Sequence, residues 1–300
     1  MRKRTLGQSE LHVSELGFGC MSLPMDQQAA NRIIDVAIDH GINYFDTADL
    51  YNRGDNERVV GEALKAKREH VYIASKVGNV WNAEREGWHW NASKEHIMNA
   101  VKESLTRLQT DYLDFYQLHG GTLDDSFSDV IDAFETLKKQ GLIRAYGISS
   151  IRPNVLKTFL PLGAADGVMM QYSALDRRPE EWFDFIRAQG ASVVSRGTIA
   201  KGLLTNDWPA RLAKHDGYLS YSQPQLIETL GTINDMYPDV LTAALSYNLA
   251  HDVVASTIVG ASSVEQLTQN IDAYNRISPD FDYAAIANVT KKELYTTHRD

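Results

Sequence analysis

Three short apolar runs in the first half of the chain each end in a polar residue that can take part in proton transfer. Asp46, Lys76 and His119 close these runs, and Tyr51 follows shortly after Asp46. A tyrosine hydroxyl, with an ordinary pKa of about 10, stays protonated at neutral pH, and a nearby ammonium stabilises the phenolate left when it donates. These residues therefore predict general-acid chemistry, with Tyr51 as donor and Lys76 assisting it. Asp46 would hold Lys76, and His119 would orient the substrate oxygen or help relay the proton.

Each of these residues alone is also typical of a structural role. A lysine near a strand end commonly extends to water, and Asp46 with Lys76 can form a purely structural ion pair. Tyr51 can likewise cover an apolar patch at a rim. The combination, in which three neighbouring strands deliver a carboxylate, an ammonium and an imidazole to one place, favours a functional site.

The elements that must position these side chains alternate between two periodicities. Runs rich in apolar and β-branched residues predict buried strands, and the segments between them repeat apolar residues with helical spacing. Strands that alternate with helices pair in parallel, and eight of them favour a closed (β/α)₈ barrel over an open sheet. The predicted strands are Leu16–Gly19, Tyr44–Thr47, Val71–Val77, Leu113–His119, Ala145–Ser150, Gly167–Tyr172, Ala191–Ser195 and Val253–Val259.

Two further elements lie outside this repeat. The segment Lys3–Val13, with a turn at Gly7, predicts a β-hairpin before the first barrel strand, and Tyr283 to about Tyr295 predicts an extra C-terminal helix. We expect one α/β domain, a (β/α)₈ (TIM) barrel over residues 1–300, with its chemistry at the carboxyl ends of the strands.

The order and spacing of these motifs resemble one known family. Residues 43–64, NYFDTADLYNRGDNERVVGEAL, are similar to the signature of the aldo-keto reductases. Other segments that resemble the family are 4–7, 16–21, 73–78, 116–119, 147–149, 171–173 and 260–263, so the likeness covers nearly the whole chain. The resemblance implies reduction of a small-molecule carbonyl substrate by a nicotinamide cofactor, with Asp46, Tyr51, Lys76 and His119 as the catalytic tetrad.

The cofactor site is expected across the strand ends. No Gly-x-Gly-x-x-Gly or phosphate-loop motif is present, whereas Gly260 and Ser262 lie between the eighth strand and an amphipathic helix, a place suited to phosphate. A serine here can also simply cap that helix. The resemblance implies contacts to the cofactor from Gly19, Cys20, Met21, Asp46, Ser149, Ser150, Gln171, Arg196, Lys201, Gly202, Leu203, Gly260, Ser262, Gln266 and Asn270.

Three of these positions depart from the family pattern. Many members have asparagine in place of Ser150, tyrosine in place of Arg196 and an arginine near Ser262. A planar guanidinium at position 196 can still stack on the nicotinamide ring. Arginine pairs bidentately with a 2′-phosphate and serine does not, so the preference between cofactors is weakened. We expect NADPH, with NADH also possible.

Three tryptophans, Trp81, Trp88 and Trp90, lie in the polar loop between Lys76 and a helix that begins near Ser93. They suit the wall of a pocket for an apolar or aromatic carbonyl compound, and they suit equally a small separate core beneath the loop.

Composition limits the classes of function. The net charge of −9 disfavours binding to nucleic acid or to an anionic membrane, both of which need a basic face. With one cysteine and no apolar run of signal-peptide or membrane-spanning length, the sequence predicts a cytoplasmic protein. A metal-dependent hydrolase is disfavoured because no closely spaced ligand pair accompanies His119. The alternative within the resembled family is a nicotinamide-binding sensor with little turnover, similar to potassium-channel β-subunits.

Overall fold

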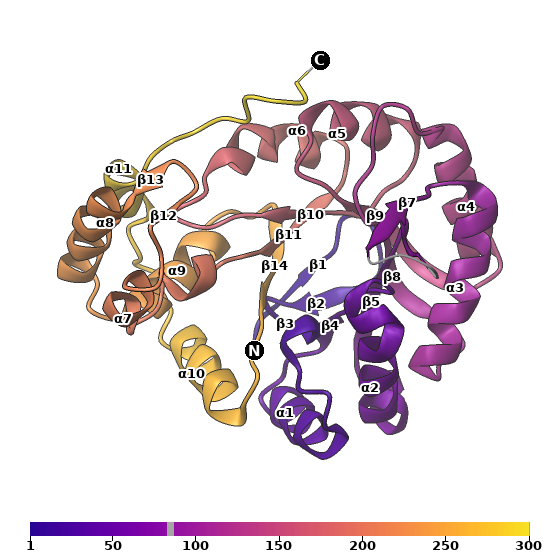
Figure 1. Ribbon diagram of the computed structural model, residues 1–300, viewed down its shortest axis with the longest axis horizontal. Coiled ribbons are helices and arrows are strands. Elements are labelled where there is room, and N and C mark those ends of the chain that lie inside the picture. Colours follow the sequence, from indigo (N-terminus) through magenta and orange to yellow (C-terminus); the bar gives the residue numbers. More distant parts are fainter. Residues whose placement is uncertain (83–86, 300) are drawn as a thin grey trace.

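Eight parallel strands close into a barrel in the computed structural model, which describes residues 1–82 and 87–299 (Figure 1). The predicted closure is confirmed, and the strand boundaries differ from the prediction by no more than two residues. The barrel strands, in their order around the barrel, are β3 (Leu16–Gly19), β4 (Tyr44–Asp46), β5 (Tyr72–Val77), β8 (Leu113–Leu118), β9 (Ile143–Ser149), β10 (Gly167–Gln171), β11 (Ser192–Arg196) and β14 (Val254–Val259).

Helices surround the barrel and pack on it through apolar stripes. In α1, for example, Ala30, Ile33, Ile34 and Ala37 are buried, as the helical spacing predicts. The α-helices are α1 (Gln27–Asp39), α2 (Asp55–Leu64), α3 (Lys94–Leu108), α4 (Phe127–Lys139), α5 (Pro153–Phe159), α6 (Phe183–Ala188), α7 (Trp208–Leu212), α8 (Gln223–Met236), α9 (Val240–Leu249), α10 (Val264–Asn275) and α11 (Tyr283–Val289). Short 3₁₀ helices are η1 (Cys20–Ser22), η2 (Tyr51–Gly54), η3 (Lys65–His70), η4 (Leu160–Leu162), η5 (Arg178–Trp182) and η6 (Ala200–Gly202).

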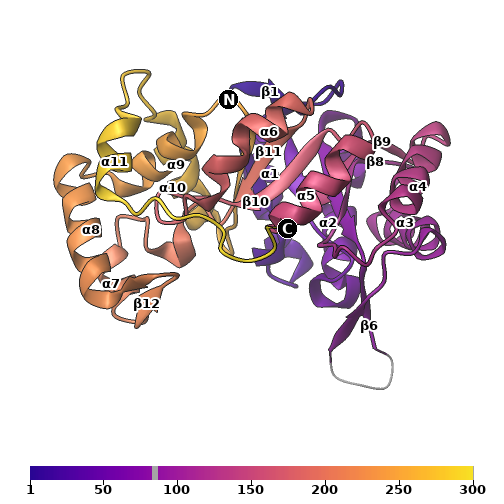
Figure 2. The same cartoon turned by 90° about the horizontal axis from the view of Figure 1, so that it is seen from above.

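The predicted N-terminal hairpin is present and closes one end of the barrel. Its strands β1 (Lys3–Thr5) and β2 (His12–Ser14) pair antiparallel, and Leu6, Leu11 and Val13 join the same buried cluster as barrel residues such as Phe115. Figure 2 shows this hairpin on the side of the barrel opposite to the hairpin that begins with β6 (Asn79–Trp81). The carboxyl ends of the strands are therefore the end open to a ligand.

Three segments differ from the sequence-based expectation. The tryptophan-rich loop contains an antiparallel hairpin, β6 with β7 (Trp88–Trp90), and a second hairpin, β12 (Gly217–Tyr218) with β13 (Tyr221–Ser222), was not predicted. The predicted C-terminal helix ends at Val289 rather than near Tyr295. It stops because Thr290 is extended and the Lys291 amide donates to the Tyr221 hydroxyl instead of a helical carbonyl.

The close contact between α2 and α3 gives a testable prediction about Gly61. A Cβ at this position would lie 2.5 Å from the carbonyl carbon and oxygen of Leu108, so Gly61→Ala is expected to destabilise the fold by about 1–3 kcal/mol. Gly231 in α8 is a matched control, since a Cβ there meets nothing within 4 Å. Gly231→Ala should stabilise the helix by up to about 1 kcal/mol. Urea denaturation measures both, and equal shifts in the two variants would contradict the packing argument.

Among the described residues, no helix has both the length and the apolar character needed to cross a membrane.

Candidate active site

The ends of three adjacent strands bring the predicted polar residues together. Asp46 ends β4, Lys76 lies near the end of β5, and His119 follows β8, with its amide donating to the Val77 carbonyl at 2.8 Å. Tyr51 begins η2, the short helix that follows β4. All four residues predicted from the sequence therefore share one mouth of the barrel.

Lys76 is the centre of this group. Its Nζ donates to Asp46 Oδ2 and to the Thr47 carbonyl, both at 2.7 Å, and lies 3.4 Å from the Tyr51 hydroxyl. The side chain is only 1% exposed. Burial alone would lower the pKa of Lys76, but the Asp46 charge and the contacts with Asp46 and Tyr51 raise it. A charged ammonium is thus held directly against the phenol oxygen.

His119 stands beside the phenol as a neutral base. Its ring meets that of Tyr51 edge to face, with centroids 6.0 Å apart. Burial, and then the positive charges of Lys76 and Arg196, lower the pKa of His119 to about 3. At neutral pH the imidazole therefore carries one proton, so one ring nitrogen can donate a hydrogen bond to a substrate oxygen and the other can accept one.

Asp49, the second carboxylate of the β4 segment, does not join the tetrad. It lies near a buried network in which Glu57 accepts hydrogen bonds from Ser75 Oγ at 2.5 Å and Arg107 Nε at 2.6 Å. Burial and the charge of Glu57 raise the pKa of Asp49 to about 8. Glu57 and Arg107 were not predicted from the sequence, because a glutamate on a helix and an arginine on the next helix are normally exposed.

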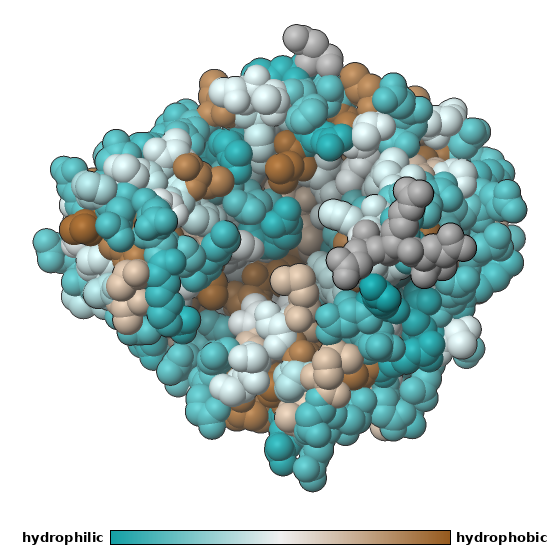
Figure 3. All heavy atoms as spheres, in the orientation of Figure 1, coloured by the Kyte–Doolittle hydropathy of each residue, from teal (hydrophilic) through white to brown (hydrophobic). Residues whose placement is uncertain are grey.

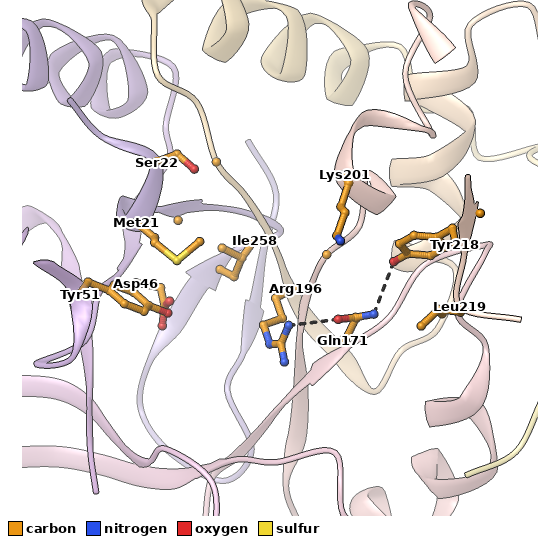
Figure 4. Close-up of a pocket in the computed structure, with 14 residues that line it drawn as sticks. Met21, Ser22, Asp46, Tyr51, Gln171, Arg196, Lys201, Tyr218, Leu219 and Ile258 are labelled. Carbon is orange, nitrogen blue, oxygen red and sulfur yellow. Dashed lines mark hydrogen bonds between the residues drawn. The ribbon is translucent and has the colours of Figure 1, made fainter. Parts of the chain in front are cut away.

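An elongated cleft of about 570 Å³ extends from Tyr51 across the ends of β3, β14 and β11 (Figure 4). Arg196 projects into it and donates from Nη1 to Gln171 Oε1 at 3.3 Å, while Gln171 Nε2 donates to the Tyr218 hydroxyl at 3.4 Å. Lys201, from η6, supplies a second cation to this cleft. Gln171 Nε2 also donates to Asp176 Oδ2 at 2.9 Å, so the Gln171 amide is held in place by its neighbours. The two cations, beside glycine-rich backbone, suit a phosphate-bearing ligand.

The predicted cofactor residues fall into three groups. Those on the cleft wall are Gly19, Met21, Asp46, Gln171, Arg196, Lys201 and Gly260. Ser149 and Ser150 line a second cavity that adjoins the cleft. Cys20, Gly202 and Leu203 are buried behind this wall. Ser262, Gln266 and Asn270 lie outside the lining at the start of α10 and along it, where Ser262 donates from its amide and hydroxyl to Gln266 Oε1.

Several residues on the cleft wall were not predicted from the sequence. They are Ser22, Gly197, Gly217, Tyr218, Leu219 and Ile258. Ile258 could have been found, because it is a side chain near the end of the eighth predicted strand. The residues of the β12–β13 hairpin carry no periodicity, and only the folded chain places them at the cleft.

A second cavity, also about 570 Å³, meets the cleft at Met21, Tyr51 and Arg196. It contains His119 and Lys76, together with apolar side chains. Figure 3 shows the molecule hollowed near its centre in the view of Figure 1, with apolar side chains inside the hollow. Two contiguous cavities that meet at Tyr51 offer room for two ligands whose reacting ends adjoin.

The three tryptophans have separate positions. Trp90 lines the second cavity, and its Nε1 donates to Asp125 Oδ1 at 2.9 Å. Its ring packs over Gly78, where a Cβ would lie 2.6 Å from it and where φ is +127°. Trp81 instead donates from Nε1 to the Leu50 carbonyl, and Trp88 is 51% exposed. Only Trp90 matches the pocket wall expected from the sequence.

Comparison with known proteins relates nearly the whole chain to one family. A profile of the Aldo/keto reductase family matches residues 15–291. The chain is 49% identical to "Uncharacterized oxidoreductase YqkF" of Bacillus subtilis, with 100% of both chains covered. It is 29% identical to the "NADH-specific methylglyoxal reductase" of Escherichia coli, covering 94% of this chain and 96% of that one. The solved structure of aldo-keto reductase AKR11C1 from Bacillus halodurans, in its holo form, superposes with a TM-score of 0.94 at 49% identity and covers 100% of both chains.

Proposed function

The chain belongs to the aldo-keto reductase family, and from this we propose that it reduces aldehydes or ketones to alcohols with NADPH, or with NADH. The observation that carries the proposal is the contact of the Lys76 ammonium with both Asp46 and the Tyr51 hydroxyl, at the point where two cavities meet. That arrangement suits proton delivery to an oxygen atom and needs a second, hydride-supplying ligand.

The proton step follows from the side chains themselves. Tyr51 donates its hydroxyl proton to the carbonyl oxygen, and Lys76 stabilises the phenolate that remains. Asp46 keeps Lys76 charged and directs it, since one carboxylate oxygen accepts from Nζ. Neutral His119, whose ring meets that of Tyr51 edge to face, donates a hydrogen bond to the same carbonyl oxygen.

The cleft is suited to hold the cofactor. A nicotinamide cofactor, when bound, supplies the hydride that the carbonyl carbon accepts. Ser149, Ser150 and Gln171 would meet its carboxamide, Arg196 would lie on the ring, and Lys201 would pair with phosphate. Gln266 and Asn270 would face the adenosine end, and Ser262 would lie near a phosphate.

The function is tested by adding NADPH or NADH to the purified protein and following tryptophan fluorescence, then absorbance at 340 nm with a panel of aldehydes and ketones. We expect saturable quenching and steady, aldehyde-dependent oxidation of the cofactor. Cofactor binding without turnover of any carbonyl compound would contradict the proposal.

Cofactor preference gives a separate prediction at Ser262. This exposed residue stands where many members of the family carry a phosphate-pairing arginine. Ser262→Arg is expected to tighten NADPH binding by roughly tenfold, because arginine forms a charge-assisted pair with the 2′-phosphate, and to leave NADH binding nearly unchanged. Fluorescence titrations of both cofactors measure this. An equal effect on the two cofactors would place the 2′-phosphate elsewhere.

A further inference from the structure

The second cavity, which adjoins the cofactor cleft at Tyr51 and would hold the substrate, is the substrate-side cavity. It has an unusual charge for this protein. Lys76, Arg152 and Arg196 contribute to its lining, whereas no aspartate or glutamate does so among the described residues. The whole chain carries a net charge of −9. A basic cavity in an acidic protein attracts anions locally, because its walls concentrate the field of the nearby charges.

The positive charge is not neutralised within the described part of the chain. Asp46 balances Lys76 through their ion pair, but no described carboxylate forms an ion pair with Arg152 or Arg196. Arg196 lies at the junction with the cofactor cleft, in contact with Gln171. Arg152 lines only the substrate-side cavity and is therefore the cation that a substrate would meet.

The surroundings of Arg152 hold the guanidinium in place. It follows β9, and its Nη1 donates to the Gly121 carbonyl at 2.9 Å, on the loop that follows β8. Since this bond uses one of the five guanidinium N–H groups, the remaining donors can still pair with both oxygens of an anion. The Asp125 carboxylate accepts hydrogen bonds from Trp90 Nε1 and the Thr122 amide and forms no ion pair with Arg152.

The rest of the cavity wall suits an apolar segment between two polar ends. Leu50, Trp90 and Ile151 line the same cavity as the proton donors Tyr51 and His119 and the cation Arg152. A ligand that matches all three parts has a carbonyl group at one end, a short carbon chain and an anionic group at the other end.

We propose that the preferred substrates are short aldehydes or ketones that carry a carboxylate or phosphate group, and that Arg152 binds this group. The proposal rests on the proposed reductase function, and it names Arg152 as the residue that determines specificity. Guanidinium pairs bidentately with both carboxylate and phosphate. A kinetic comparison of carboxylate-bearing and phosphate-bearing substrates therefore distinguishes the two classes.

The first test compares pairs of compounds that share the carbonyl end and differ in whether the other end is anionic. For the wild-type enzyme, kcat/KM is expected to be roughly 10- to 100-fold higher for 4-oxobutanoate than for its methyl ester, or for glyceraldehyde 3-phosphate than for glyceraldehyde. The larger ratio identifies the class of anion. In Arg152→Met the ratio of the two kcat/KM values should fall close to one, and in Arg152→Lys it should fall less. Arg32→Met removes the same charge at an exposed residue of α1, so its ratio should equal that of the wild type. Ratios near one in the wild type, or unchanged in Arg152→Met, would overturn the proposal.

The second test does not depend on turnover. Trp90 lines the same cavity, so tryptophan fluorescence can follow titrations with succinate and with uncharged succinamide. Succinate is expected to bind roughly tenfold more tightly or better, and Arg152→Met should abolish the difference. Selective succinate binding in a protein that reduces no carbonyl compound would refute the reductase function and leave the anion site standing. Turnover of the ester and the acid at equal rates, without selective succinate binding, would refute only the anion site.

Discussion

Replacing Tyr51 with phenylalanine is expected to lower kcat for aldehyde reduction by about 10²- to 10⁴-fold, the usual contribution of a positioned general acid. The change removes only the hydroxyl that lies 3.4 Å from Lys76 Nζ. The ring that packs edge to face on His119 is retained, so the melting temperature and cofactor binding should stay close to those of the wild type. Steady-state kinetics, thermal unfolding and fluorescence titration of the same preparation measure the three quantities.

Tyr237→Phe is the matched control for this variant. The Tyr237 hydroxyl donates to the Asp282 carbonyl, and Tyr237 lines neither the cofactor cleft nor the substrate-side cavity. Its removal should leave kcat unchanged. Retention of wild-type kcat in Tyr51→Phe would show that another group donates the proton. Loss of cofactor binding in Tyr51→Phe would show that Tyr51 contributes to binding the cofactor.

The largest expected effect on stability comes from Lys76→Met. This change removes one partner of an ion pair whose two side chains are 1% and 6% exposed, and it leaves the Asp46 carboxylate buried without its cation. Breaking a buried pair in this way typically costs about 3–5 kcal/mol, so the variant should be both inactive and clearly less stable in urea.

The pH dependence of this loss has a defined sign. Burial already raises the pKa of Asp46, with Lys76 opposing that effect, so loss of the ammonium raises it further. The unfolded-state pKa of an aspartate is about 3.9. A carboxyl whose folded-state pKa is higher than this destabilises the fold at neutral pH, and this destabilisation decreases as the pH falls and the carboxyl becomes protonated. The difference in free energy of unfolding between the wild type and Lys76→Met should therefore become smaller as the pH is lowered from 8 to 5.

A double variant separates the structural role of Lys76 from its chemical role. Asp46→Asn combined with Lys76→Met removes both charges, so part of the lost stability should return while activity stays absent. A single Lys76→Met variant as stable as the wild type at pH 8 would contradict the account of the pair. Activity restored by the double variant would contradict the role of Lys76 in the proton step.

The barrel and the tetrad could be predicted because their signals lie within short stretches of sequence. A buried parallel strand is an apolar run, and the polar residue that ends it is visible in the same run, as with Asp46 and His119. Parallel pairing then brings those ends together without further information. The helix faces followed in the same way from their spacing, as Ile33 and Ala37 of α1 show.

The remaining parts of the site depend on contacts between distant segments. Arg152 reaches the substrate-side cavity with the help of a bond to Gly121, and Trp90 packs closely against Gly78 in a hairpin that has no clear alternating pattern. Tyr218 reaches the cleft from a hairpin whose strands are two residues each. Strands this short show no hydrophobic periodicity in the sequence, so only tertiary packing determines where their side chains lie.

The central claim, carbonyl reduction with Tyr51 as the acid, is tested most directly by product analysis with a cofactor deuterated at the transferable position of the nicotinamide. With wild-type protein and an excess of aldehyde, we predict many turnovers and one deuterium on the carbon of each alcohol molecule formed, and we predict hardly any alcohol with Tyr51→Phe saturated by the same cofactor. A single oxidation per protein molecule without continued turnover, alcohol without deuterium, or equal yields from the two proteins would contradict the account.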